Sequence, residues 1–259
     1  MIAGITVWTT FSALFSVVGC PACAAVLWEL FKRHKRGNYV TPNDVFMINI
    51  TIMDLLFLLF IPLGLFNFLF WLFQPVQMWS DFLYDLNLTG RPLLTACMCF
   101  DSYLAVVHPV FYRTHRSPTF GILMAAAVWA ITLAKGTISI VIDELNHSPW
   151  AMFMYVIALP VIIICNSSVL WTLRKSHSGR TGLHPMKKKA LQIITNSMIV
   201  TVVVYLPPVV VYIFGPLIFS DDKMYDCYLA IPILVMPTAG SAIMPLLYLG
   251  NMRGFCSGI

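Results

Sequence analysis

Charged side chains are scarce in this sequence. Asp, Glu, Lys and Arg together make up 10% of the 259 residues, whereas hydrophobic residues make up 59% and the mean hydropathy is +0.82. An ordinary soluble domain is about a quarter charged. The composition therefore excludes an ordinary soluble protein and indicates a membrane protein.

The apolar stretches also lack the alternation that is typical of transmembrane β-strands. Residues 54–61, for example, read Asp-Leu-Leu-Phe-Leu-Leu-Phe-Ile. A helix needs roughly 20 apolar residues to cross a bilayer core, and a spanning segment must satisfy its own backbone hydrogen bonds. We therefore predict an all-α, seven-transmembrane helix bundle that forms a single domain over residues 1–259, with spans at approximately 5–31, 43–70, 77–107, 119–141, 149–175, 186–213 and 226–249.

Basic residues are distributed unevenly between the predicted loops. They follow the first, third, fifth and seventh spans, whereas the opposite loops are mainly acidic. The basic side of a membrane protein is cytoplasmic, so we expect the amino terminus outside and the carboxyl terminus inside. The formal net charge of +5 then indicates orientation and contact with an anionic lipid bilayer, not nucleic-acid binding. The basic residues are Lys32, Arg33, Lys35, Arg36, Arg113, Arg116, Arg174, Lys175, Arg180, Lys187, Lys188, Lys189 and Arg253.

The sequence offers no converging set of catalytic or metal-ligating residues. Its six histidines lie in or beside predicted loops on two sides of the membrane, so we expect no enzyme activity, no cofactor and no bound metal. Of the cysteines, only Cys227 reaches the outer side, so no outer disulfide is expected within the chain. Asn146 begins the sequon that falls outside the membrane and is a candidate glycosylation site.

Two charged residues fall in the middle of predicted spans. Asp54 lies eleven residues from Asn43, at the cytoplasmic start of the second span, and Arg91 lies eleven residues from Ser102 in the third; both are therefore about 16 Å deep. Charged groups inside a membrane generally pair or line a polar cavity, so we predict an ion pair between Asp54 and Arg91. Two alternatives stay open: Arg91 faces lipid, or the two charges relay ions or protons. We also expect Asp44 to be the N-cap of the second span.

Residues 101–109 read Asp-Ser-Tyr-Leu-Ala-Val-Val-His-Pro. They resemble the aspartate-arginine-tyrosine signature that ends the third span of rhodopsin-like (class A) G-protein-coupled receptors, closest in style to the peptide and purinergic branch. Asp54 matches the family's usual sodium-binding aspartate, and Arg91 falls where the family has a small polar sodium ligand. The resemblance therefore implies that the guanidinium stands in for the sodium ion. Trp129 matches the tryptophan of the fourth span, and we assign it to packing alone.

The coupling motifs depart from the family pattern. Ser102 stands where the family has an arginine that restrains the sixth span and meets the G protein, and a serine has neither the charge nor the reach for these roles. Met244 replaces the polar residue of the seventh-span motif. The resemblance implies switch or coupling roles at Asp101, Ser102, Tyr103, Tyr205, Pro207, Met244, Pro245 and Tyr248.

The resemblance also implies a ligand pocket between the outer halves of the third, fifth, sixth and seventh spans. Tyr84 lies seven residues before Arg91 on nearly the same face, and Tyr205 and Tyr212 are further candidates. Asp85 is either a counter-ion for an amine or a structural residue. The seventh span contains no lysine, which argues against a retinal pigment.

The leading hypothesis is a plasma-membrane receptor for an unknown extracellular ligand, with a heterotrimeric G protein as its partner and an altered coupling motif at Ser102. A second hypothesis is an atypical seven-span protein that does not signal: a decoy, a scavenger or a dimer partner. The third is an ion or proton conductor that uses Asp54 and Arg91.

Overall fold

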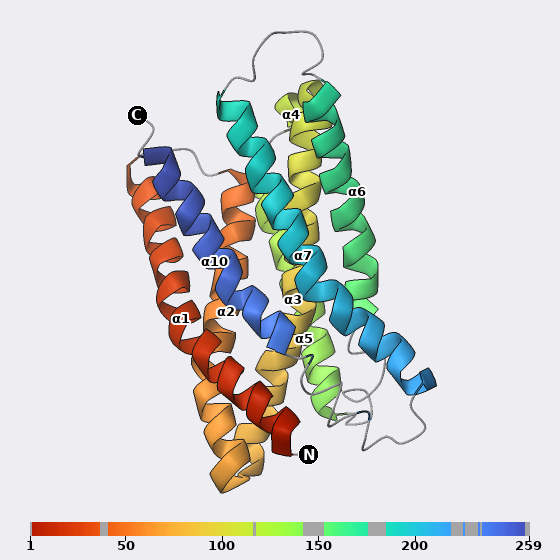
Figure 1. The fold of residues 1–259 in the computed structure, drawn as a ribbon. Coiled ribbons are helices and arrows are strands. Elements are labelled where there is room, and N and C mark those ends of the chain that lie inside the picture. The colour runs from red at the N-terminus through yellow and green to blue at the C-terminus, as the bar shows by residue number, and fades with distance from the viewer. Residues whose placement is uncertain are drawn as a thin grey trace.

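A computed structural model describes residues 2–36, 41–115, 118–141, 153–175, 185–218, 225, 233 and 235–256. The regular structure within these ranges is entirely helical, which confirms the predicted all-α class (Figure 1). Asn146 and Cys227 lie outside the described residues. The elements are α1 (Ile2–Lys35), α2 (Pro42–Phe66), a π-helical turn η1 (Asn67–Trp71), α3 (Gln74–Val107), α4 (Pro109–His115), α5 (Pro118–Val141), α6 (Phe153–Lys175), α7 (Pro185–Ile218) and α10 (Val235–Cys256).

Helix α3 is the central element of the bundle. It packs against α2, α5 and α6, while α1 packs against α2 and α10, and α7 packs against α6 and α10. The first and last helices therefore lie side by side, although they are far apart in sequence (Figure 1). This arrangement brings the middle of α2, α3 and α10 together.

The outward faces of the helices are apolar and the interior contains polar groups. Four helical segments in the described part are long and apolar enough to cross a membrane: Thr6–Lys35, Pro42–Trp71, Thr119–Ile140 and Phe153–Lys175. Helix α3 is as long as α1, but it carries Asp85, Arg91 and Asp101, all of which are buried. Charges in a spanning helix face the interior of a bundle because lipid cannot solvate them. The alternative that Arg91 faces lipid is therefore wrong.

The start of α2 differs from the sequence-based expectation. The N-cap is Thr41, whose Oγ1 accepts a hydrogen bond from the backbone N–H of Asp44 at 3.2 Å, and the Asp44 carboxylate accepts one from the Thr41 N–H at 3.1 Å. Asp44 is therefore the third helical residue of a capping box, not the N-cap. Pro42 takes the first helical position, where a missing N–H costs nothing.

A short turn connects α2 to α3. The Asn67 side chain bonds both backbone groups of Phe73, accepting from its N–H at 2.9 Å and donating to its carbonyl at 3.2 Å. Leu72 has a positive φ of 51°, a conformation that is uncommon for a leucine. The turn keeps the adjoining ends of α2 and α3 close together.

Candidate functional site

The predicted partners Asp54 and Arg91 lie in contact at the centre of the bundle. Nη1 of Arg91 is 3.1 Å from Oδ1 of Asp54, and their exposed fractions are 1% and 0%. A buried charge is stable only when it is paired and its hydrogen bonds are satisfied. The guanidinium provides the paired charge for Asp54, and α2 and α3 are joined at this depth.

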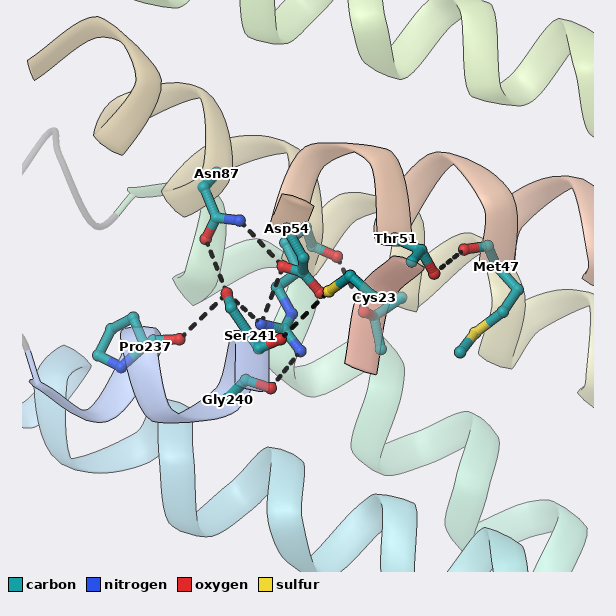
Figure 2. A network of polar contacts seen from close by, with 10 residues as sticks. Cys23, Met47, Thr51, Asp54, Asn87, Pro237, Gly240 and Ser241 are labelled. Atoms are coloured by element: carbon teal, nitrogen blue, oxygen red, sulfur yellow. Dashed lines mark hydrogen bonds and ion pairs between the residues drawn. The ribbon is translucent and has the colours of Figure 1, made fainter. Parts of the chain in front are cut away.

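Arg91 also bonds to α10, which the sequence did not predict. Its Nη1 donates to Oγ of Ser241 at 2.5 Å, and its Nη2 donates to the carbonyl of Gly240 at 2.7 Å. Figure 2 shows Asp54, Ser241 and Gly240 converging from α2 and α10. One side chain therefore connects three helices, which the planar fork of an arginine permits and a compact ammonium does not.

Asn87 completes the network from α3. Its Nδ2 donates to Oδ1 of Asp54 at 3.0 Å, and its Oδ1 lies 3.4 Å from the hydroxyl of Ser241, which donates to it (Figure 2). Asn87 precedes Arg91 by four residues and therefore lies on the same helix face. That spacing is the signal by which Asn87 could have been found in the sequence.

Gly240 allows α10 to approach the guanidinium closely. A Cβ built on this residue would lie 2.8 Å from Cγ1 of Val204 and 3.5 Å from Nη1 of Arg91. The first distance is shorter than real Cβ contacts, so a side chain here would push α10 away from α7. A residue without a Cβ is needed where two helices and a charged group meet.

Cys23 and Pro245 contribute to the same region. Pro245 has no backbone N–H, so it cannot donate the helical hydrogen bond to the carbonyl of Ser241 four residues earlier. The Cys23 thiol lies 4.0 Å from that carbonyl and donates to it (Figure 2). The cysteine at this position of α1 is therefore a weak donor to a carbonyl that the proline leaves open.

Tyr205 lies against the network from α7. Its ring centroid is 5.8 Å from Cζ of Arg91 and 5.0 Å from the ring of Tyr155. A guanidinium near an aromatic ring gains a cation–π attraction. The aromatic residue that we assigned to a switch thus contacts the arginine that joins the other helices.

The remaining pocket candidates separate into two groups. Tyr84 and Tyr212 pack at the edge of one apolar cluster that contains Tyr155 and Tyr205. Asp85 lies elsewhere: its Oδ1 accepts a hydrogen bond from Nζ of Lys135, and its Oδ2 accepts one from Ser139 at 3.3 Å, both on α5. Asp85 therefore has a structural ion pair, and the geometry gives it no counter-ion role beside the tyrosines.

The C-terminal end of α3 is held by local hydrogen bonds. Asp101 is buried and accepts from the hydroxyl of Tyr112 in α4 at 3.1 Å. The hydroxyl of Ser102 donates to the carbonyl of Met98 in its own helix at 2.9 Å, and the Tyr103 hydroxyl is 3.4 Å from Nε2 of His108. Ser102 thus bonds within α3 and makes no bond to α7 in the described part of the chain.

The other predicted switch residues lie in α7 and α10. Pro207 is within α7, close to the buried Tyr205. Met244 and Tyr248 are half-buried in α10, and Pro245 between them is buried. Met244, Pro245 and Tyr248 follow Ser241 along α10, the helix to which Arg91 is hydrogen-bonded.

Trp129 does more than the packing that we predicted. Its indole Nε1 donates to Oδ1 of Asn49 at 2.8 Å and so connects α5 to α2. Among the described residues, no group of three or more His, Cys, Asp or Glu side chains could hold a metal ion.

Comparison with known proteins identifies related sequences. Residues 23–150 match the family described as 7 transmembrane receptor (rhodopsin family). The chain is also similar to human G-protein coupled receptor 42, with 22% identity over 243 residues, which covers 82% of this chain and 67% of that receptor.

Proposed function

Since the chain belongs to the rhodopsin-like family of seven-transmembrane receptors, we propose that it is a plasma-membrane receptor for an extracellular ligand whose resting conformation is held by an internal cation. That cation is the guanidinium of Arg91. The observation that carries this proposal is that one buried side chain bonds Asp54 in α2 and Ser241 and Gly240 in α10.

The positive charge beside Asp54 does not fit a bound sodium ion. Oδ1 of Asp54 already accepts a hydrogen bond from Asn87 at 3.0 Å and forms an ion pair with Nη1 of Arg91 at 3.1 Å, whereas Oδ2 has no hydrogen-bond partner among the described residues. A sodium ion beside this carboxylate would meet the positive guanidinium at close range, where repulsion in a low-dielectric interior is strong. The resting state of this receptor is therefore independent of sodium, and no step in its mechanism uses the ion.

Activation in this proposal requires the contacts between Arg91 and α10 to break. Ser241 and Gly240 lie on the same helix as Met244, Pro245 and Tyr248, so α10 cannot shift at its centre without stretching these bonds. A ligand shifts the equilibrium only by the difference in its affinity for the two states. Binding must therefore favour an α10 position in which the guanidinium keeps Asp54 and releases Ser241.

The proposed orientation follows the basic residues. Helix α1 ends in Lys32, Arg33, His34 and Lys35, and α6 ends in Arg174 and Lys175. These ends carry the excess of positive charge that is typical of the cytoplasmic side. We place the start of α1 outside the cell.

Coupling to a heterotrimeric G protein is weak in this proposal, because Ser102 replaces the family's arginine and its hydroxyl bonds to Met98 in the same helix. The test is nucleotide exchange on purified G protein by the receptor in lipid nanodiscs. We expect low basal exchange from the wild type, a clear rise for Ser102→Arg, and no change for the control Ser102→Ala. Exchange by the wild type as fast as that of Ser102→Arg would contradict the proposal.

The short reach of Ser102 also favours a second candidate, a seven-span protein that binds ligand without signalling. The same assay separates the two. Wild-type exchange equal to that of empty nanodiscs, together with exchange by Ser102→Arg, favours the non-signalling protein. Measurable wild-type exchange favours the receptor.

A further inference from the structure

A cavity of about 180 Å³ lies between α1, α2, α3 and α10, in the half of the bundle where α1 begins. Its walls are mainly apolar and rich in aromatic rings: Trp8, Phe57, Phe60, Ile61, Leu65 and Phe68. Binding sites for small molecules are typically apolar and contain a few placed polar groups. This cavity shares Tyr84 with the tyrosine cluster between α3, α6 and α7 where the sequence predicted a pocket, but its other lining residues lie outside that cluster.

Three hydroxyl groups in the cavity wall lack a hydrogen-bond partner among the described residues. They belong to Ser12 of α1 and to Ser80 and Tyr84 of α3. Ser12 is only 2% exposed. Buried polar groups are nearly always bonded to protein or to ordered water, so three unpartnered hydroxyls in the wall of one cavity point to a partner inside it, either water or a ligand.

Ser16 shows what a satisfied serine looks like in the same helix. It is one turn after Ser12 and is 3% exposed, but its hydroxyl donates to the carbonyl of Leu58 at 2.6 Å. The two serines are therefore equally buried, but the hydroxyl of Ser16 has a hydrogen-bond partner and that of Ser12 has none among the described residues. Ser12 is the one that lines the cavity.

The charge of the wall restricts the chemistry of the occupant. Among the described residues that line the cavity, Asp81 is the only charged one. It is exposed and accepts a hydrogen bond from Nε2 of Gln77 at 2.9 Å. A carboxylate ligand would meet no basic partner among these described residues. A cation would have to approach a carboxylate that is already bonded and solvated.

We propose that this cavity binds a small uncharged amphipathic molecule, with an apolar body about the size of one ring and a hydroxyl or carbonyl oxygen that pairs with the hydroxyl of Ser12. A comparable apolar cavity of about 150 Å³ holds one benzene molecule. The inference rests on the proposed receptor function, because it names the class of ligand that the receptor binds.

The cavity is placed to act on the Arg91 network. Phe57 follows Asp54 by three residues, Thr238 precedes Ser241 by three, and Tyr84 precedes Arg91 by seven, and all three line the cavity. These offsets are about 4.5 Å for Phe57 and Thr238 and about 10 Å for Tyr84 along the helix axis. An occupant therefore contacts the same three helices that the guanidinium joins, one to two turns away.

The experiment is fluorine NMR of 3-fluorobenzyl alcohol with the full chain in lipid nanodiscs, corrected with empty nanodiscs for partition into lipid. We compare wild type, Ser12→Ala and the matched control Ser16→Ala. Loss of one hydrogen bond should weaken binding to Ser12→Ala about fivefold, with no change for Ser16→Ala. Thermal unfolding checks both variants: Ser16→Ala should melt lower than wild type, whereas Ser12→Ala should not.

Equal affinity of Ser12→Ala and wild type, or no binding beyond empty nanodiscs, would overturn the proposal and leave ordered water as the partner of the hydroxyls. Two further probes test the chemical class: 3-fluorobenzoate should not bind, and 3-fluorobenzylamine should bind more weakly than the alcohol. Preference for either ion would also overturn it. Because binding is measured without a G protein, failure here is distinguishable from failure of the exchange assay.

Discussion

Replacing Arg91 by methionine should destabilise the protein more than replacing both members of the ion pair. Methionine keeps most of the length of the side chain but removes its charge. Asp54, which is 0% exposed, then keeps only the hydrogen bond from Asn87. Removing one partner of a buried pair costs about 3–5 kcal/mol, because the remaining charge is left without compensation. The Gly240 carbonyl and the Ser241 hydroxyl lose their donor as well.

The assay is thermal unfolding of the purified protein in one detergent, with the variants Arg91→Met, Asp54→Asn and the double substitution. About 3–5 kcal/mol corresponds to a decrease in Tm of roughly 6–20 °C for a chain of this size. The double variant contains no buried charge at this site and should recover at least about 2 kcal/mol of the loss, which a double-mutant cycle measures directly.

A surface pair provides the control. Arg33 and Asp44 are 3.6 Å apart, and the Arg33 side chain is 37% exposed, so Arg33→Met should cost less than about 1 kcal/mol. If Arg91→Met and the double variant unfold at the same temperature, the two charges are not coupled and the reasoning fails.

Two other substitutions test the contacts around this centre. Gly240→Ala should destabilise the protein by about 1–3 kcal/mol, because the added methyl group would overlap Val204; an unchanged Tm would show that α10 does not approach α7 as closely as described. Lys135→Met should cost up to about 3 kcal/mol, since it leaves the buried Asp85 with Ser139 alone; restoration of the Tm by Asp85→Asn in the same chain is expected, and its absence would argue against that pair.

The fold class was predictable because residues that face lipid must be apolar, so the hydropathy of the sequence reveals that the chain lies in a membrane. Long apolar runs such as 54–61 leave no alternative to helices in that environment. Helix α3 is the element where the pattern is weakest, since its charged residues are accommodated by neighbours that the sequence does not place. Its central position becomes visible only once α2, α5 and α6 are packed around it.

The site was predictable in part. Depth along two helices was enough to pair Asp54 with Arg91, because both distances follow from the helical rise. The contacts to Ser241 and Gly240 depend on how α10 lies against α3, and no local pattern encodes that. Asp85 illustrates the same limit: neighbouring residues on a helix point about 100° apart, so the sequence could not decide whether Tyr84 or Asp85 faces the bundle centre.

The N-cap of α2 and the hydrogen-bond partner of Trp129 also could not be predicted from the sequence pattern. Thr41 and Asp44 are both good N-cap residues, and the sequence alone does not reveal which of them starts the helix. The indole of Trp129 needed a partner inside the membrane, and that partner, Asn49, belongs to a different helix. Such partners follow from the packing of α5 on α2.

The most direct test of the central claim is the effect of sodium on thermal unfolding. Wild type, Arg91→Ser and the control Arg91→Ser with Asp54→Asn are melted in sodium chloride and in choline chloride at equal concentration. A ligand that binds only the folded state stabilises it by RT ln(1 + [L]/Kd), so the Tm rises with the concentration of the ligand. We predict the same wild-type Tm in both salts, a higher Tm in sodium for Arg91→Ser, and no sodium effect in the control. A wild-type Tm that rises with sodium would show that the guanidinium does not occupy the place of the ion.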